Sequence, residues 1–245
     1  GVCLFAFPGG FLGPESDSRA YNTLFDLVSR ERLDGLVIWG AQLAIYGGLA
    51  GVRALYERFH PLPIINLGMP LAGVPSVWFD NYQGMRDAVT HLIEVHGRRR
   101  IAYLGGPQGT PESQDRYRAY TDALLDHSIP LDPMLVVSDA EMQEERARAY
   151  STMGNTRAYR GAGMRVLLAR RALRPGEDFQ AVVGYDDTLC LGALIELRAI
   201  GARVPYDVAL VSFDDIREAS FAVPPLTTVR QSFYDLGYVG VERLL

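Results

Sequence analysis

The stretch "VALVSFDDIREASFAVPPLTTVRQ", Val208 to Gln231, decides the fold because it runs an apolar strand directly into two adjacent carboxylates. An uninterrupted apolar run is typical of a strand in a parallel sheet whose two faces are both covered by helices. A buried strand that ends in Asp214 and Asp215 indicates a polar partner beyond its carboxyl end. That partner could be a metal ion, a reacting bond, a bound sugar or water.

Other short β-rich segments alternate with longer amphipathic segments along the chain. We expect strands at 2–7, 35–40, 62–68, 75–80, 100–106, 134–137 and 181–187, and helices near 18–31, 52–59, 84–96, 113–127, 157–171, 187–200 and 234–245. This alternation predicts an α/β fold built on doubly wound parallel sheets. Residues 150–163 are rich in loop-forming residues, and we expect a mobile loop there.

Composition narrows the class of protein. The chain has 245 residues, of which 48% are hydrophobic and 22% charged, as in soluble globular proteins. No apolar run approaches the roughly 20 residues that span a bilayer. The net charge of −5 offers no general attraction for nucleic acid or anionic lipid. The two cysteines, Cys3 and Cys190, are far apart, which favours a reducing cytoplasm over a disulfide framework.

Several enzymatic mechanisms lack the residues that they require. The sequence contains no lysine, which excludes a lysine Schiff base and a Walker A phosphate loop. Of the four histidines, only His91 and His96 are close in sequence, and a spacing of five predicts different faces of a helix. Paired aspartates at two strand ends could hold Mg²⁺, but no phosphate loop accompanies them. We therefore expect no enzyme, no cofactor and no metal site.

The ends of the expected strands indicate a ligand site, because ligands of open α/β sheets bind beyond the carboxyl ends of the strands. Planar hydrogen-bonding groups and aromatic rings meet there, a combination that suits a polyhydroxylated ligand. Asp187 and Asp215 could instead cap helices, Arg116 could be a solvated helix charge, and Trp39 could belong to the core. The ends supply Trp39, Asp80, Asn81, Arg116, Ser138, Asp139, Asp186, Asp187, Asp214 and Asp215.

Four stretches together resemble the effector-binding region of the lactose-repressor/galactose-repressor (LacI/GalR) family. They are "RLDGLVIWG", "VPSVWFDNYQGMRDAVTHLIEVHGRRRIAYLGGP", "DDTLCLGALIELRAIGARVPYDVALVSFDD" and "PPLTTVRQSFYDLG". They occur in the family's order and spacing and cover nearly the whole chain from Asp34 onward.

The resemblance implies two α/β subdomains of the periplasmic-binding-protein type with a ligand cleft between them. Residues 1–82 plus 231–245 would form an incomplete N-terminal subdomain, and residues 83–230 the C-terminal one. By this resemblance the ligand contacts would be Arg116, Asp186, Asp214, Trp39, Asp139 and Phe213, and the crossovers would contain Asp80, Asn81, Arg230 and Gln231.

Two positions depart from the family pattern in ways that bear on the ligand. Ala119 replaces the glycine that follows the arginine of the family motif. Asp186 stands where the family usually has asparagine, and an extra carboxylate favours a ligand with more donors or a positive group.

The function implied by the resemblance is sensing of a small-molecule effector, a sugar or related metabolite, by a transcriptional regulator. DNA would be bound through an N-terminal head that this sequence lacks, and a cytoplasmic homodimer without membrane contact is expected. By the same resemblance, the first strand and helix of the family fold would be missing before Gly1. The alternatives are a sensor attached to a kinase or cyclase output, or an exported sugar-binding protein of a transporter.

Overall fold

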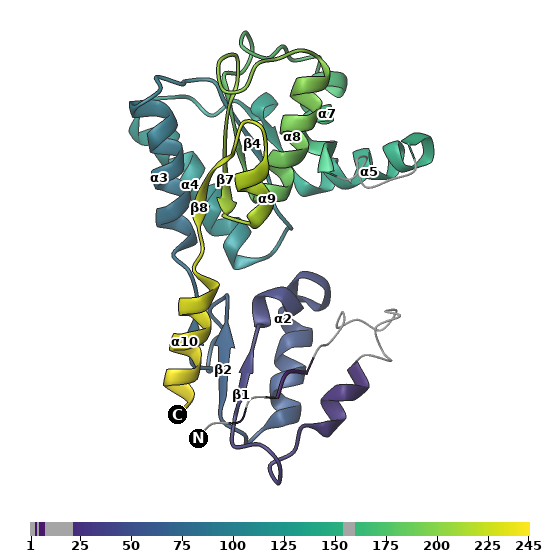
Figure 1. The fold of residues 1–245 in the computed structure, drawn as a ribbon, viewed down its shortest axis with the longest axis vertical. Helices are drawn as coiled ribbons and strands as arrows, with labels where there is room; N and C mark the ends of the chain where they lie inside the picture. Colours follow the sequence, from purple (N-terminus) through teal and green to yellow (C-terminus); the bar gives the residue numbers. More distant parts are fainter. Residues whose placement is uncertain (1–2, 4, 8–21, 154–159) are drawn as a thin grey trace. The chain divides into compact units, whose positions relative to one another are not determined.

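The computed structural model describes residues 3, 5–7, 22–153 and 160–245. The chain divides into two compact units (Figure 1). Unit 1 comprises Gly1–Phe79, Gly109–Pro111 and Ser232–Leu245, and unit 2 comprises Asp80–Gln108 and Glu112–Gln231. Each unit has its own parallel sheet and its own apolar core, and each is described separately below.

Unit 2 is built on a five-stranded sheet in the order β5-β4-β6-β7-β8. Its strands are β4 (Ile101–Leu104), β5 (Val136–Val137), β6 (Ala181–Gly184), β7 (Ala209–Asp214) and β8 (Thr227–Arg230). All four pairings are parallel. Because parallel strands end at the same edge of a sheet, the polar residues that follow them are brought together there.

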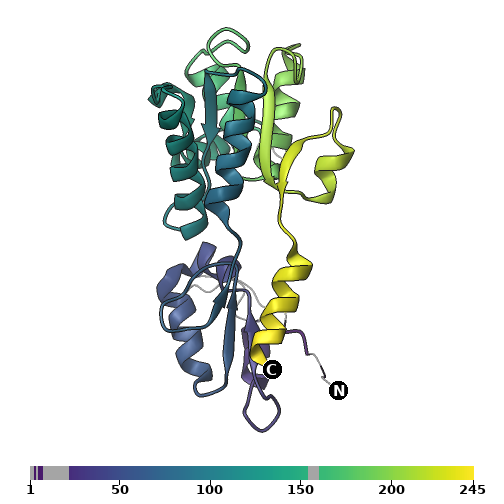
Figure 2. The same cartoon turned by 90° about the vertical axis from the view of Figure 1, so that its left-hand side faces the viewer.

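Helices cover both faces of this sheet (Figure 2). They are α3 (Asn81–Glu94), α4 (Pro111–Asp126), α5 (Asp139–Met153), α7 (Ala162–Arg165), α8 (Asp187–Ala199) and α9 (Arg217–Phe221), with a 3₁₀ turn at Pro133–Leu135 and a π turn at Val166–Arg170. Successive strand residues alternate between two cores: Ile101 and Tyr103 pack with α3 and α4, whereas Ala102 and Leu104 pack with the opposite helices. This two-sided burial is the reason that the strands read as uninterrupted apolar runs.

Unit 1 contains a three-stranded parallel sheet in the order β1-β2-β3. The strands are β1 (Leu36–Ile38), β2 (Ile64–Leu67) and β3 (Ser76–Val77), and the helices are α2 (Gly40–Phe59), α10 (Phe233–Leu244) and a 3₁₀ helix at Thr23–Leu27. Leu236 of α10 packs on Leu67 of β2, and Val52 and Tyr56 of α2 pack in a separate cluster. The α/β fold with parallel sheets is therefore confirmed.

Local expectations at the start of the chain and at the expected loop differ from the structure. Among the described residues of the strand expected at 2–7, Cys3 and residues 5–7 are not in a strand, and Val2 and Leu4 lie outside the described residues. The helix expected at 18–31 is a short 3₁₀ helix where it is described, and residues 18–21 lie outside that part. The expected loop begins inside α5, which runs to Met153, and residues 154–159 lie outside the described part.

Sequence reasoning missed α5, although its start carries a clear signal. Ser138 and Glu141 form a capping box, in which the Ser138 backbone N–H donates to Glu141 Oε2 at 3.0 Å and the Glu141 backbone N–H donates to Ser138 Oγ at 3.3 Å.

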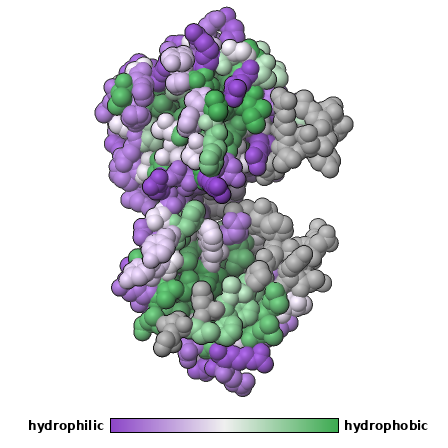
Figure 3. All heavy atoms as spheres, viewed as in Figure 1, coloured by the Kyte–Doolittle hydropathy of each residue, from purple (hydrophilic) through white to green (hydrophobic). Residues whose placement is uncertain are grey.

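Hydrophilic side chains are interspersed with hydrophobic ones over the face of unit 2 drawn in Figure 3. Within the described residues, none of the helices combines the length and the apolar character that crossing a membrane requires.

Candidate ligand-binding site

Arg116 lies at the centre of the polar cluster at the carboxyl end of the unit 2 sheet, and it is only 3% exposed. Its guanidinium donates from Nε to Asn81 Oδ1 at 2.9 Å, from Nη1 to the Tyr185 carbonyl oxygen at 2.6 Å and from Nη2 to Asp214 Oδ1 at 3.3 Å. Its Cζ lies 3.9 Å from the ring centroid of Phe213 and 4.5 Å from that of Tyr185. Three hydrogen bonds and two ring faces therefore hold this planar cation in one orientation.

Asp214 is the carboxylate that faces Arg116. The backbone φ is 109° at Asp214 and 55° at Asp215. L residues rarely adopt positive φ values, so the backbone is strained where β7 ends. Gln231 donates from Nε2 to Asp214 Oδ1 at 2.9 Å. Burial raises the pKa of Asp214 to about 7, Arg116 opposes that shift, and the neighbouring Asp186 adds to it. Near neutral pH this group can therefore act as an acceptor or, when protonated, as a donor.

Asp186 places a second carboxyl group at the same end of the sheet. It caps α8 by accepting a hydrogen bond from the Leu189 backbone N–H at 2.8 Å. Burial raises its pKa, whereas the charges of Arg116 and Arg146 lower it. Arg146 also lies 3.6 Å from Asp139, measured from Nη1 to Oδ1. Asp139 is therefore held by Arg146, and ligand contact by Asp139 stays a prediction.

Asp187 is a buried structural link between α8 and the two last strands of unit 2. It is fully buried and accepts hydrogen bonds from the Ile216 backbone N–H at 2.7 Å, from Thr228 Oγ1 at 2.6 Å and from the Ser212 hydroxyl. The interpretation of Asp187 as a helix cap is wrong, because Asp186 is the N-cap of α8.

Asp215 is not a helix cap either, since the N-cap of α9 is Ile216. It forms an ion pair with Arg230, whose Nε lies 2.5 Å from Asp215 Oδ2. Its backbone N–H donates to Thr228 Oγ1 at 3.2 Å. Asp215 and Arg230 therefore fasten the end of β7 to β8, beside Asp214.

The structure joins five of the residues nominated from the sequence into one directly contacting cluster, and we call it the Arg116 cluster: Arg116, Asp214, Phe213, Asn81 and Gln231. Asp80 instead caps α3 by accepting from the Gln83 backbone N–H at 2.8 Å. Trp39 belongs to unit 1, where its ring centroid lies 5.4 Å from that of Phe233. Ligand contact by Trp39 stays a prediction.

Sequence reasoning missed Tyr185 and Arg146. Tyr185 contributes both a ring face and a carbonyl oxygen to Arg116, and its signal was its position directly before Asp186. Arg146 could not be placed, because α5 itself was not predicted.

Two family models together match almost all of this chain. Residues 12–156 match the model of periplasmic binding proteins and the sugar-binding domain of the LacI family. Residues 89–245 match the model of the periplasmic binding protein-like domain.

Individual relatives of the chain are also LacI-family or HTH-type transcriptional regulators. The HTH-type transcriptional repressor CytR of Escherichia coli strain K12 is 29% identical over 91% of this chain, and the chain spans only 58% of CytR. A sugar-binding transcriptional regulator of the LacI family from Escherichia coli, complexed with phosphate, superposes with a TM-score of 0.69 at 27% identity, covering 96% of this chain and 74% of that one. The transcriptional regulator CelR in complex with cellobiose superposes with a TM-score of 0.63 at 30% identity, covering 93% and 64%.

Two units that are each built on a parallel sheet define the fold of the periplasmic-binding-protein type. The family models are more specific. The chain belongs to the LacI family of periplasmic-binding-protein-like, sugar-binding domains.

Proposed function

We propose that this chain is the effector-sensing region of a LacI/GalR-type transcriptional regulator and that the Arg116 cluster binds the effector. The single observation that carries the site assignment is the fixed guanidinium of Arg116 beside a carboxyl group, Asp214, whose pKa lies near neutrality. Burying and stacking an arginine in this way provides oriented donors at little further cost in conformational entropy.

A polyhydroxylated ligand fits the chemistry of this cluster. The carboxyl group of Asp214 accepts hydrogen bonds from hydroxyls, and the Arg116 guanidinium donates to hydroxyl oxygens. Asp186 adds a second carboxyl group, which favours a ligand that carries an additional donor such as an amino group. Two related proteins support a carbohydrate, since one is a sugar-binding regulator and the other was solved with cellobiose.

The proposed output of the sensor, a change in DNA binding, is based on the relatives. The chain spans less than two thirds of CytR, so DNA binding is assigned to a segment of the complete protein outside this sequence. Effector binding would shift the population between conformations, and a coupling free energy of about 1–3 kcal/mol would change DNA affinity. We further propose that the protein is a cytoplasmic homodimer without catalytic activity, because the relatives are transcriptional regulators.

Calorimetric titration with a panel of neutral and amino sugars tests the ligand proposal. For a sugar that binds, Asp214→Ala or Arg116→Ala is expected to weaken binding by about 1.5–3 kcal/mol, the range for hydrogen bonds to charged groups. Because Arg116 is buried, its variant also requires a circular dichroism spectrum to show that the fold persists.

Gln231→Ala is the milder site variant, expected to weaken binding by about 0.5–1.5 kcal/mol through its effect on Asp214. Arg118→Ala is the matched control, because Arg118 lies on the same helix but is exposed and paired with Asp115. Unchanged affinity in both Asp214→Ala and folded Arg116→Ala would refute the site assignment.

A further inference from the structure

His91 and His96 face each other at the end of α3. Their Nε2 atoms lie 3.1 Å apart, their ring centroids are 4.8 Å apart and the ring planes are inclined by 84°. The expectation that a spacing of five puts them on different helix faces is wrong, because the helix does not continue. It ends at Glu94, and Gly97, with a φ of 62°, donates back to the Ile93 carbonyl oxygen at 3.0 Å. That turn brings His96 over His91.

The two ring nitrogens are close enough to share a metal ion. At 3.1 Å apart, the two Nε2 atoms are within hydrogen-bond distance of each other. A Zn–N bond is roughly 2.0–2.1 Å long, so both nitrogens can reach one ion that takes the place of their mutual hydrogen bond.

We propose that His91 and His96 form a two-histidine site for a divalent transition-metal ion of the Zn²⁺, Ni²⁺ or Cu²⁺ class. Neutral imidazole is a favoured ligand for these ions. Within the described residues there is no group of three or more His, Cys, Asp or Glu side chains that could hold a metal. Two imidazoles are thus the protein ligands, and water completes the coordination.

The surroundings suit a cation with bound water. His91 lies in the last turn of α3 and His96 follows the end of that helix, where the negative end of the helix dipole favours positive charge. Both histidines line a cavity of about 400 Å³, whose other walls include Leu92, Val204 and Leu226. Arg98 shares this cavity and opposes a cation, but its Nη2 is turned to the Pro205 carbonyl oxygen at 3.2 Å.

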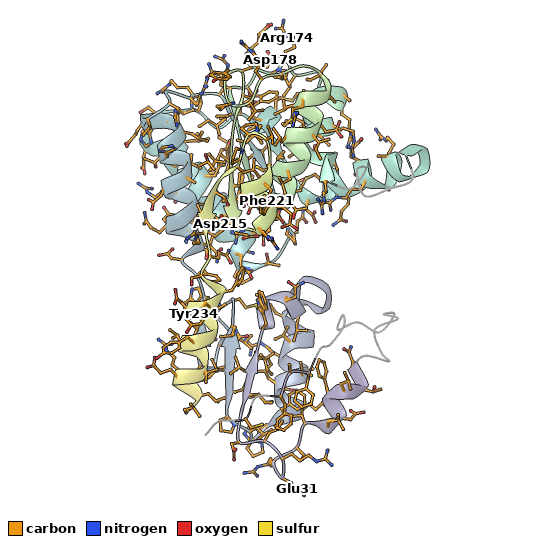
Figure 4. The ribbon with its side chains drawn as sticks, in the orientation of Figure 1. Glu31, Arg174, Asp178, Asp215, Phe221 and Tyr234 are labelled. Carbon is orange, nitrogen blue, oxygen red and sulfur yellow. The ribbon has the colours of Figure 1, made fainter. Side chains whose placement is uncertain are left out.

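This site is remote from the Arg116 cluster. The cavity is lined by Ala209, Leu210 and Val211 at the beginning of β7, whereas Asp214 ends that strand, about 16 Å from Ala209 at 3.3 Å per residue. In Figure 4 Asp215 marks the carboxyl end of the sheet. The proposal for the metal site therefore does not rest on the proposed effector site, and the two can fail separately.

Calorimetric titration of the tag-free protein with Zn²⁺ at neutral pH tests the proposal. One ion is expected to bind per chain. His91→Gln and His96→Gln are each expected to weaken that binding at least about tenfold, since even changes outside the ligand shell cost that much. His60→Gln, which removes a histidine of unit 1, is the matched control and should leave the affinity unchanged.

Electron paramagnetic resonance of the Cu²⁺-loaded protein gives a second readout, with hyperfine coupling from two imidazole nitrogens expected in the unaltered protein and from one in either variant. Sugar binding should be the same in all four proteins. The proposal is overturned if the unaltered protein binds no Zn²⁺, or if His91→Gln and His96→Gln bind it as tightly as His60→Gln does.

Discussion

Asp214 holds a proton near neutrality because its carboxyl group is buried, and the guanidinium of Arg116 only partly opposes this effect. The ordinary pKa of such a group is 3.8, and the folded protein raises it to about 7. Between these values the folded state binds more protons than the unfolded state. The free energy of unfolding therefore falls as the pH rises from about 4 to about 7.

Asp214→Asn removes this titration. We expect the variant to lose the part of the decline in stability between about pH 4 and pH 7 that Asp214 contributes, because an amide carries no proton to release, whereas Asp186, whose pKa burial also raises, keeps its own part. Urea unfolding at several pH values measures how the free energy of unfolding changes with pH. A variant with the same slope as the unaltered protein would contradict the assignment of the raised pKa to Asp214.

Asp207→Asn is the control, because the contribution of Asp207 to stability depends on pH in the opposite direction. The hydrogen bonds and charge of Arg203 lower the pKa of Asp207 to about 2, so its contribution is present above about pH 4 and is lost as the pH falls. Because this ion pair lies at the surface, with Asp207 partly exposed and Arg203 exposed, we expect a small effect that is confined to acidic pH and leaves the neutral range unchanged.

Individual residues were predictable from the sequence where a strand end fixed their position. Asp214 follows from the apolar run that it terminates, whereas Phe213 was named only through the family resemblance. Tyr185 was not chosen, because stacking on Arg116 depends on a helix and a strand that are distant in sequence. The pairing of His91 with His96 was predicted wrongly, since the effect of the turn at Gly97 on the side chains is tertiary.

At the scale of elements, α8 depends on a close approach that only glycine permits. A Cβ at Gly192 would lie 1.9 Å from the Arg160 carbonyl oxygen, a backbone atom. Gly192→Ala is expected to destabilise the protein by about 1–3 kcal/mol through overpacking. Denaturant unfolding monitored by circular dichroism measures this cost.

Gly237→Ala in α10 is the matched substitution, because a Cβ there would meet no atom within 4 Å. It should stabilise the protein by about 0.5–1 kcal/mol, since alanine loses less conformational entropy in a helix. Equal effects of the two substitutions would show that helix propensity, and not the contact with Arg160, governs both positions.

The strands were easier to predict than the helices. β4, β6 and β7 are short apolar runs between turn residues, and two-sided burial makes that pattern hard to mistake. The helix α5 is rich in charged residues, so its hydrophobic periodicity is weak, and the capping box of Ser138 and Glu141 was its main local signal.

At the scale of the whole molecule, unit 2 is close to a continuous piece of chain. Residues 80–231 contain its entire sheet and both apolar clusters that cover the two sheet faces. We expect a fragment of these residues to fold by itself in one cooperative transition. Chemical denaturation followed by both circular dichroism and tyrosine fluorescence tests this expectation, and non-coincident transitions would contradict it.

The architecture of the whole chain followed from the sequence because helices and strands alternate throughout it. The beginning of the chain was the weakest part of that prediction. The apolar residues Phe5 and Phe7 suggested a strand, but hydrophobicity alone does not show whether a neighbouring strand is available for pairing.

The immobilised guanidinium of Arg116 also makes this domain a practical starting point for biosensor engineering. Asn81, Tyr185 and Phe213 fix that anchor through contacts within the protein, so selection for a new analyte need not rebuild it. Saturation mutagenesis can instead concentrate on Asp186, accepting residues such as asparagine and serine that still cap α8. Ligand specificity would then be changed by substitutions at one position, while the contacts that orient Arg116 remain unchanged.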